Sequence, residues 1–140
     1  MQIHGSCVSR NGAGVLIVGP SGAGKSDLTL RLLDRGFELV ADDRVEIEQG
    51  LARAPAPLAG LLEVRGIGLL RLPAAPAVPL ALVVELGGAA ERLPGPRRHP
   101  ELGVPCIALD PDAHSAPQRV ALALDCALGR IASIAGAFAP

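Results

Sequence analysis

The chain has 140 residues, of which 49% are apolar, and a formal net charge of −1. That length allows one domain, residues 1–140, with a substantial aliphatic core. The near-neutral charge and the presence of only two aromatic residues, both Phe, argue against a nucleic-acid partner, which would need a basic surface or stacking rings.

The termini and the cysteines indicate the cellular compartment in which the protein is expected. The N-terminus lacks the basic region and long apolar stretch of a signal peptide, and the uncharged residues 131–140 are too few to span a membrane. Cys7, Cys106 and Cys126 are odd in number and widely spaced, so they fit neither a zinc pattern nor a disulfide framework. We therefore expect reduced thiols, a cytoplasmic protein and no membrane partner.

The first elements are expected to be strands around a glycine-rich loop and a helix. The Asn11-Gly12 pair favours a tight hairpin between two antiparallel strands. Leucines at helical spacing follow the glycine-rich loop, and Gly36 should end that helix. The elements expected in chain order are strands at residues 2–9 and 14–18, a helix at 27–34, and strands at 37–41, 45–48 and 51–53.

The second half alternates proline-rich connections with apolar segments. Ser115 is placed to cap the last helix, and Pro117 is tolerated in its first turn. The elements expected here are a helical turn at 58–64, a surface connection at 73–79, a strand at 80–86, a mobile polar segment at 87–101, a strand at 104–109, and a helix at 118–137 with an interruption allowed at Gly129.

Residues 19–26 match G-x-x-x-x-G-K-[ST], the phosphate-binding P-loop. An apolar strand before the loop and a helix after it let loop amides and the helix N-terminus face phosphate oxygens. Lys25 is the only lysine in a chain otherwise rich in arginine, and its compact ammonium suits a place between phosphates better than a planar guanidinium. The sequence predicts that a nucleoside triphosphate or similar polyphosphate binds Gly19, Pro20, Ser21, Gly22, Ala23, Gly24, Lys25 and Ser26, with the Ser26 hydroxyl on Mg²⁺.

Two places in the chain could supply the carboxylate that phosphoryl transfer requires. Asp42 and Asp43 end an apolar strand, and a parallel neighbour of the loop strand would present them beside the phosphates. Adjacent side chains of an extended segment point in opposite directions, so one Asp should face the site and the other turn away. Glu85 ends the most apolar strand and is the rival metal ligand. The alternatives are an acid pair in a solvated turn and an acid on the surface.

Three more residues have two interpretations each. Glu63 and Arg65 would share one face of an extended segment, where they could serve a metal and a phosphate, or form a simple surface ion pair. His4 lies on a strand expected to pair with the loop strand, which could bring it near the γ-phosphate. A lone histidine is, however, more often structural.

Taken together, these segments resemble HPr kinase/phosphorylase, a family that acts on a serine of the phosphocarrier protein HPr. The matching pieces are His4-Gly5, the loop at 19–26, Leu-Val-Ala-Asp-Asp at 39–43, and Leu-Glu-Val-Arg-Gly-Ile-Gly at 62–68. The chain looks most like the short alphaproteobacterial form, firmly over residues 2–70 and loosely over 80–125. The resemblance implies an α/β fold, a P-loop kinase core related to phosphoenolpyruvate carboxykinase, with a mixed central sheet and flanking helices.

The resemblance also implies an activity, its cofactors and its partners. The chain would phosphorylate HPr with ATP and Mg²⁺ and regulate a phosphotransferase system. In the reverse reaction, inorganic phosphate would attack phosphoserine and pyrophosphate would leave. Longer members assemble as hexamers, so a homo-oligomer, a hexamer or smaller, is expected.

Roles of single residues follow from the same resemblance. Asp42 would be the general base toward the serine hydroxyl, and Asp43 would support the site, although these two roles could be exchanged. His4 would lie close to the reacting phosphate. Ser26 and Glu63 would hold Mg²⁺, while Arg65 would lie near the phosphate of the substrate.

Two departures from the longer members keep other functions open. The first is that their Pro-Gly-Arg-Asn segment corresponds here to residues 114–119, where Arg119 is the candidate replacement for its arginine. The second is that the chain ends soon after this segment. One alternative is a P-loop kinase of a small molecule, for which Arg97 and Arg98 would supply the lid. The other is a regulatory module that binds ATP and a partner without turnover. Such a module need not depend on Asp42, whereas the enzyme must.

Overall fold

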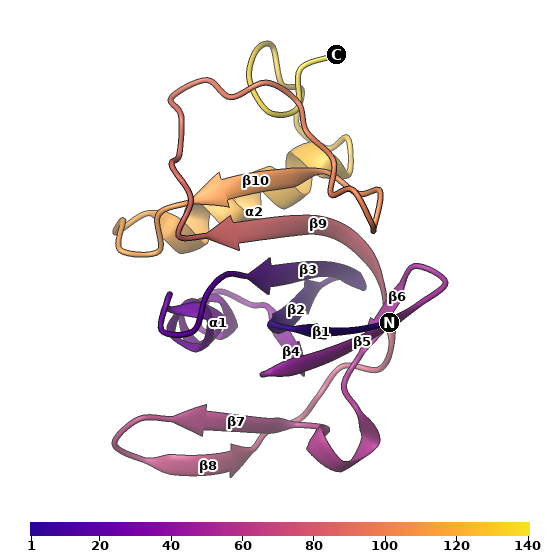
Figure 1. Ribbon diagram of the computed structural model, residues 1–140, viewed down its shortest axis with the longest axis vertical. Helices are drawn as coiled ribbons and strands as arrows, with labels where there is room; N and C mark the ends of the chain where they lie inside the picture. Colours follow the sequence, from indigo (N-terminus) through magenta and orange to yellow (C-terminus); the bar gives the residue numbers. More distant parts are fainter.

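The computed structural model describes all residues 1–140 and combines a mixed sheet with two helices (Figure 1). Its elements are β1 (Gln2–His4), β2 (Ser6–Arg10), β3 (Ala13–Val18), α1 (Lys25–Leu33), β4 (Glu38–Ala41), β5 (Arg44–Glu48), β6 (Leu51–Arg53), a 3₁₀ turn (Ala56–Leu58), β7 (Leu61–Val64), β8 (Gly68–Arg71), β9 (Val78–Leu86), β10 (Cys106–Leu109) and α2 (Ala116–Ala127). The expected α/β class, with a mixed central sheet and flanking helices, is confirmed.

Strand β9 organises the sheet because it pairs with three other strands. Its first residues run antiparallel to β6, and the remainder runs parallel to β3 on one side and to β10 on the other. The full order is β1-β5-β6-β9-β3-β2-β4, with β10 beside β9, while β7 and β8 form a separate hairpin. The carboxyl ends of β3, β9 and β10 therefore meet at one edge, where their arrowheads lie together in Figure 1.

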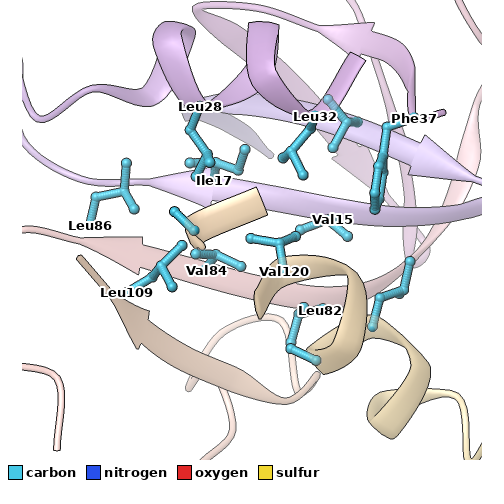
Figure 2. Packing of buried hydrophobic residues seen from close by; sticks show 14 residues of the cluster. Val15, Ile17, Leu28, Leu32, Phe37, Leu82, Val84, Leu86, Leu109 and Val120 are labelled. Atoms are coloured by element: carbon cyan, nitrogen blue, oxygen red, sulfur yellow. The ribbon is translucent and has the colours of Figure 1, made fainter. Parts of the chain in front are cut away.

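Both helices pack on one face of the sheet, where a cluster of 14 buried apolar residues lies. Leu28 and Leu32 of α1 point toward Ile17 of β3, and Val120 of α2 lies beside Val84 of β9 (Figure 2). All five side chains are fully buried. Each such burial contributes about 1.5–3 kcal/mol, so branched aliphatic side chains can supply a core that has almost no aromatic residues. This packing fixes the start of α1 against the end of β3.

The opposite face carries a second cluster of 11 buried residues. Leu16 and Val83 from β3 and β9 meet Val45 and Ala52 from β5 and β6 there. The part of the sheet formed by β1, β5 and β6 thus covers the face that the helices leave free. Neither helix has the length and apolarity needed to cross a membrane.

The expected hairpin turn at Asn11-Gly12 is confirmed. The φ angles of Asn11 and Gly12 are 51° and 78°, and Arg10 pairs with Ala13 across a two-residue turn. Two positive φ angles are what the tight turns of twisted hairpins require. Local chemistry was sufficient to place this turn.

The strand expected at residues 2–9 is wrong, because it is two strands separated at Gly5. Strand β1 pairs with β5, whereas β2 pairs with β3. A Cβ on Gly5 would lie 2.6 Å from the carbonyl oxygen of Ile17, so only glycine fits this crossing. His4 therefore does not lie on a strand paired with β3, contrary to the prediction.

Other boundaries also differ from the expected ones. The helical turn at 58–64 is wrong, because Leu61–Val64 is strand β7 and only Ala56–Leu58 is helical. The connection at 73–79 ends earlier than predicted, since β9 starts at Val78 and uses its first residues to pair with β6. The strand predicted at 104–109 begins two residues later, at Cys106.

The last helix stops at Ala127 and does not continue to residue 137. Gly129 has a φ of 74°, its amide donates to Cys126 O, and the Arg130 amide donates to Asp125 O at 2.8 Å. This is the hydrogen-bond pattern of a glycine-terminated helix. Ser115 precedes the helix without capping it by its side chain, and its hydroxyl instead accepts the Arg119 Nε–H at 2.9 Å.

Candidate active site

The loop between β3 and α1 has the geometry of a phosphate cradle. Gly24, the residue before the helix, has a φ of 102°, a conformation that favours glycine. A Cβ on Gly19 would lie 2.8 Å from Leu86 O, so β9 approaches the loop too closely for a side chain. Helix α1 begins at Lys25, and its free N-terminal amides and dipole favour an anion at this point.

Lys25 is buried and its ammonium lies against the loop. Its Nζ donates to Gly19 O at 2.8 Å and to Pro20 O at 3.0 Å. An ammonium has three N–H donors, so one remains beyond these two bonds. The only lysine of the chain is thus held where the loop would place phosphate oxygens.

Asp42 reaches the same place from the end of β4. Its Oδ1 accepts the Ser26 hydroxyl at 3.1 Å and the Ser6 hydroxyl at 2.7 Å. Strand β4 is not the parallel neighbour of β3 that was expected, because β2 lies between them. Since β2 is antiparallel to both, β4 still runs in the direction of β3, and Asp42 still arrives at the edge that carries the loop.

Asp43 contacts His4, and the alternation expected of an extended segment does not apply to the pair because β4 already ends at Ala41. The φ of Asp43 is 71°, and its Oδ1 lies 3.3 Å from Nδ1 of His4. Both side chains are more than half exposed, at 58% for His4 and 63% for Asp43. The Gly5 amide donates to Asp43 O at 3.1 Å, which ties this turn to the crossing between β1 and β2.

The oxygens of Ser26 and Asp42 fit neighbouring ligands of Mg²⁺. They are hard donors 3.1 Å apart, and adjacent ligands of an octahedral Mg²⁺ lie about 3 Å from each other. No group of three or more His, Cys, Asp and Glu side chains is placed to hold a metal ion. A site with two protein oxygens suits Mg²⁺, which keeps waters and phosphate oxygens as its other ligands.

Glu63 and Arg65 lie apart from this cluster, on the hairpin of β7 and β8. Glu63 belongs to β7, whereas Arg65 lies in the turn, so the two do not share one extended face. Both are exposed and neither forms an ion pair, so the interpretation as a surface pair is wrong. Residues 63–69 line a hollow of about 580 Å³. Figure 1 shows the turn of this hairpin on the same side of the view as the carboxyl end of β3.

Glu85, the rival metal ligand, is bound by other partners. Its register partner on β3 is Val18, but its carboxylate accepts hydrogen bonds from Arg97 and from the Cys106 thiol. Burial raises the pKa of Glu85, yet the hydrogen bonds from Arg97 and Cys106 outweigh it and the net pKa is lowered. Burial, and then the Glu85 carboxylate, raise the pKa of Cys106 to about 11, so the thiol stays protonated.

The two arginines considered for the lid of a small-molecule kinase, Arg97 and Arg98, both have partners within the fold. Arg97 is paired with Glu85, and Arg98 donates to Gly103 O at 2.8 Å. Both guanidinium groups thus already have partners, Arg97 on strand β9 and Arg98 within its own segment. The three cysteines are free thiols, as expected, and two of them are buried.

Sequence reasoning missed Ser6. Its hydroxyl is buried and holds Asp42, yet it belongs to no motif. Its role depends on β2 pairing with β4, a contact between segments far apart in the chain. A serine directly after the glycine that separates β1 from β2 was the only local indication.

Comparisons with known proteins agree with this geometry. The family model of the HPr Serine kinase C-terminal domain matches residues 1–75, which include the phosphate loop and both aspartates. The HPr kinase/phosphorylase of Levilactobacillus brevis is 49% identical over 74 residues, covering 49% of this chain and 24% of that protein. The HPr kinase/phosphorylase of Clostridium novyi is 47% identical over 77 residues, covering 52% of this chain and 25% of that protein.

A solved structure extends the similarity beyond the matched half. The Hpr(Ser) kinase/phosphatase from Coxiella burnetii is 26% identical, with a TM-score of 0.77 over 92% of this chain and 97% of that chain. The matches to the curated relatives span about a quarter of their length. The fold similarity therefore covers nearly all of the chain, whereas the closer sequence similarity is concentrated in the half that carries the site.

Proposed function

The chain belongs to the HPr serine kinase C-terminal domain family, and we propose that it transfers the γ-phosphoryl group of ATP to a serine of an HPr-type phosphocarrier protein. The observation that carries the proposal is the contact between Asp42 and Ser26 at the N-terminus of α1. This contact supports the proposal because a carboxylate and a hydroxyl then lie beside a loop that has the P-loop sequence. Phosphoryl transfer needs these parts side by side.

Each residue has a defined part in the proposed reaction. Residues 19–26 cradle the phosphates, and the Lys25 ammonium balances their charge. Ser26 and the neighbouring Asp42 oxygen hold Mg²⁺, which neutralises charge on the transferred group, and Glu63 is the further ligand that the family resemblance assigns. Asp42 accepts the proton of the attacking serine hydroxyl, and Arg65 lies near the substrate phosphate.

Asp43 and His4 support this arrangement in the proposal. Their contact at 3.3 Å holds the turn that follows β4, so it orients the neighbouring Asp42. An exposed imidazole at this position is also free to approach a phosphate on the bound substrate. The family resemblance assigns His4 this place beside the reacting group.

The same groups can remove the phosphoryl group again by phosphorolysis. Inorganic phosphate attacks the phosphorus of phosphoserine, the bond to the serine oxygen breaks, Asp42 passes the proton of the attacking phosphate to that oxygen, and pyrophosphate leaves. A phosphocarrier modified in this way would regulate a phosphotransferase system. We propose that the chain acts in the cytoplasm as a homo-oligomer, a hexamer or smaller.

The decisive experiment is a phosphorylation assay. The purified protein is incubated with Mg²⁺, γ-labelled ATP and HPr from the same organism, with an HPr Ser→Ala variant and an Asp42→Asn enzyme as controls. We expect label on HPr that either substitution abolishes, and release of labelled pyrophosphate when inorganic phosphate is added. Absence of label while ATP still binds would overturn the proposal in favour of a small-molecule kinase or an ATP-binding module without turnover.

A further inference from the structure

A cavity borders the phosphate loop, and the roles proposed above leave it unused. Its volume is about 420 Å³, within the range of pockets for small ligands. One wall is the loop itself at residues 20–23, and the others are the segments that follow β9 and β10, at residues 87–88 and 109–112. The cavity is thus continuous with the place where phosphates would bind.

The order of the strands puts this cavity opposite the aspartates. Strands β9 and β10 lie on one side of β3, whereas β2 and β4, which leads to Asp42, lie on the other. Ligands of open α/β sheets bind outside the carboxyl ends of the strands, the edge at which β3, β9 and β10 end together in Figure 1. A triphosphate whose last phosphate meets Ser26 and Asp42 would therefore cross the loop and direct its other end into the cavity.

The lining suits a group that donates hydrogen bonds through hydroxyls. Asp110 and Asp112 are exposed acids, and ionised carboxylates accept hydrogen bonds but repel phosphate. Asp110 Oδ1 accepts the Asp112 amide at 2.9 Å, a bond that leaves the Asp112 carboxylate unused. In dinucleotide-binding α/β folds, an acid beyond the phosphate-binding turn accepts a ribose hydroxyl of the nucleotide in this way.

The wall that carries these acids is attached to the phosphate-binding helix. Arg31 of α1 donates to Pro111 O at 2.6 Å and pairs with Asp27 at 3.2 Å. On the facing wall, a Cβ on Gly88 would meet nothing within 4 Å, so this side of the cavity is open. The lining contains no aromatic ring and no amide or basic side chain that could read the edge of a base.

We propose that this cavity holds the nucleoside end of the nucleotide, with ribose hydroxyls donating to Asp110 and Asp112 and with little contact that distinguishes one base from another. This inference rests on the proposed use of a nucleoside triphosphate. It makes the sugar, and not the base, the part of the nucleoside that the protein recognises. ATP and GTP should then bind with similar affinity, and 2′-deoxy-ATP more weakly than ATP.

The test compares two probes, Mg-ATP and Mg-tripolyphosphate, which has the phosphate chain but no nucleoside. Calorimetric titration of the full chain should show that Asp112→Ala weakens ATP binding about tenfold. Tripolyphosphate binding should stay within about twofold at physiological salt, where an exposed charge is screened. Gly88→Leu should fill the cavity and give the same pattern. Glu101→Ala, which removes an exposed acid outside the cavity, should change neither affinity.

Three results would overturn the inference. One is unchanged ATP binding in both variants, the second is an equal loss of ATP and tripolyphosphate binding, and the third is a wild-type protein that binds both probes equally well. A wild-type protein that binds neither probe would instead overturn the proposed function, because the phosphate loop itself would be at fault. The two failures are therefore distinguishable.

Discussion

Two acids stand at the ends of apolar strands on either side of β3, and their partners give them different properties. Asp42 accepts hydrogen bonds from two hydroxyls, those of Ser6 and Ser26. Glu85 is bound by the Arg97 guanidinium and by the Cys106 thiol. Hydroxyl donors leave the negative charge of Asp42 available to a metal ion or a proton, whereas the guanidinium balances that of Glu85. The partners, and not the position at a strand end, separate a candidate catalytic acid from a structural one.

The largest effect should come from exchanging each carboxylate for its amide. Asp42→Asn keeps the shape of the side chain but removes its charge, and we expect turnover to fall about a thousandfold, within the range for loss of a general base. Glu85→Gln should change turnover by less than about twofold, since this acid takes no part in the reaction. Steady-state phosphorylation of HPr measures both.

Nucleotide binding is the control for this pair. In the absence of Mg²⁺, both variants should bind ATP as the wild type does, because the loop and Lys25 are unchanged in each. If Glu85→Gln lost as much turnover as Asp42→Asn, the distinction between the two acids would be wrong.

The next largest effect is on stability, and it tests the backbone crossing at Gly5, next to the strand that holds Asp42 through Ser6. Gly5→Ala should lower the free energy of unfolding by about 2 kcal/mol, because its Cβ would lie 2.6 Å from a backbone carbonyl that cannot move freely. Gly95→Ala, where a Cβ meets nothing within 4 Å, should change it by less than about 0.5 kcal/mol. Urea denaturation gives both values. Equal stability of the two variants would show that the Gly5 crossing is not tightly packed.

These contrasts show which parts of the structure the sequence could predict. The Asn11-Gly12 turn and the glycine-rich loop between a strand and a helix were predicted correctly, because each depends on backbone angles set by a few adjacent residues. The break at Gly5 and the insertion of β2 between β3 and β4 depend on pairing between distant segments, which periodicity does not encode.

The residues of the candidate site also include some that the sequence could predict and some that it could not. Motifs indicated Lys25, Ser26 and Asp42, and the structure brings these three residues together. No motif indicated Ser6, or that Arg97 binds Glu85, because each contact joins elements brought together only by the fold. The last helix was predicted too long because apolar residues continue after Gly129, although its positive φ ends the helix.

A smaller effect should follow from removing the hydroxyl that holds Asp42. Ser6→Ala leaves the carboxylate in place but takes away its 2.7 Å hydrogen bond. We expect about a tenfold weaker apparent affinity for Mg²⁺, since groups that orient metal ligands contribute at least this much. Ser9→Ala is the matched control, because Ser9 is a buried serine on the same strand without a contact to Asp42. Activity measured against Mg²⁺ concentration should separate the two variants, and an equal response would remove Ser6 from the site.

The smallest effect concerns the Glu85 side and appears in the pH dependence of stability. The pKa of Glu85 is lowered in the folded protein, so its pairing with Arg97 stabilises the fold above the ordinary value of about 4.3 and is lost as pH falls through the folded pKa. Arg97→Gln should therefore cost less than about 1 kcal/mol at pH 7, because both partners are partly exposed, and less still at an acidic pH at which the protein remains folded. Arg98→Gln, whose guanidinium contacts only a carbonyl, should show no such pH dependence. Urea denaturation at the two pH values measures the difference. A cost that grew toward acidic pH would mean that Arg97 stabilises the fold by some contact other than the Glu85 charge.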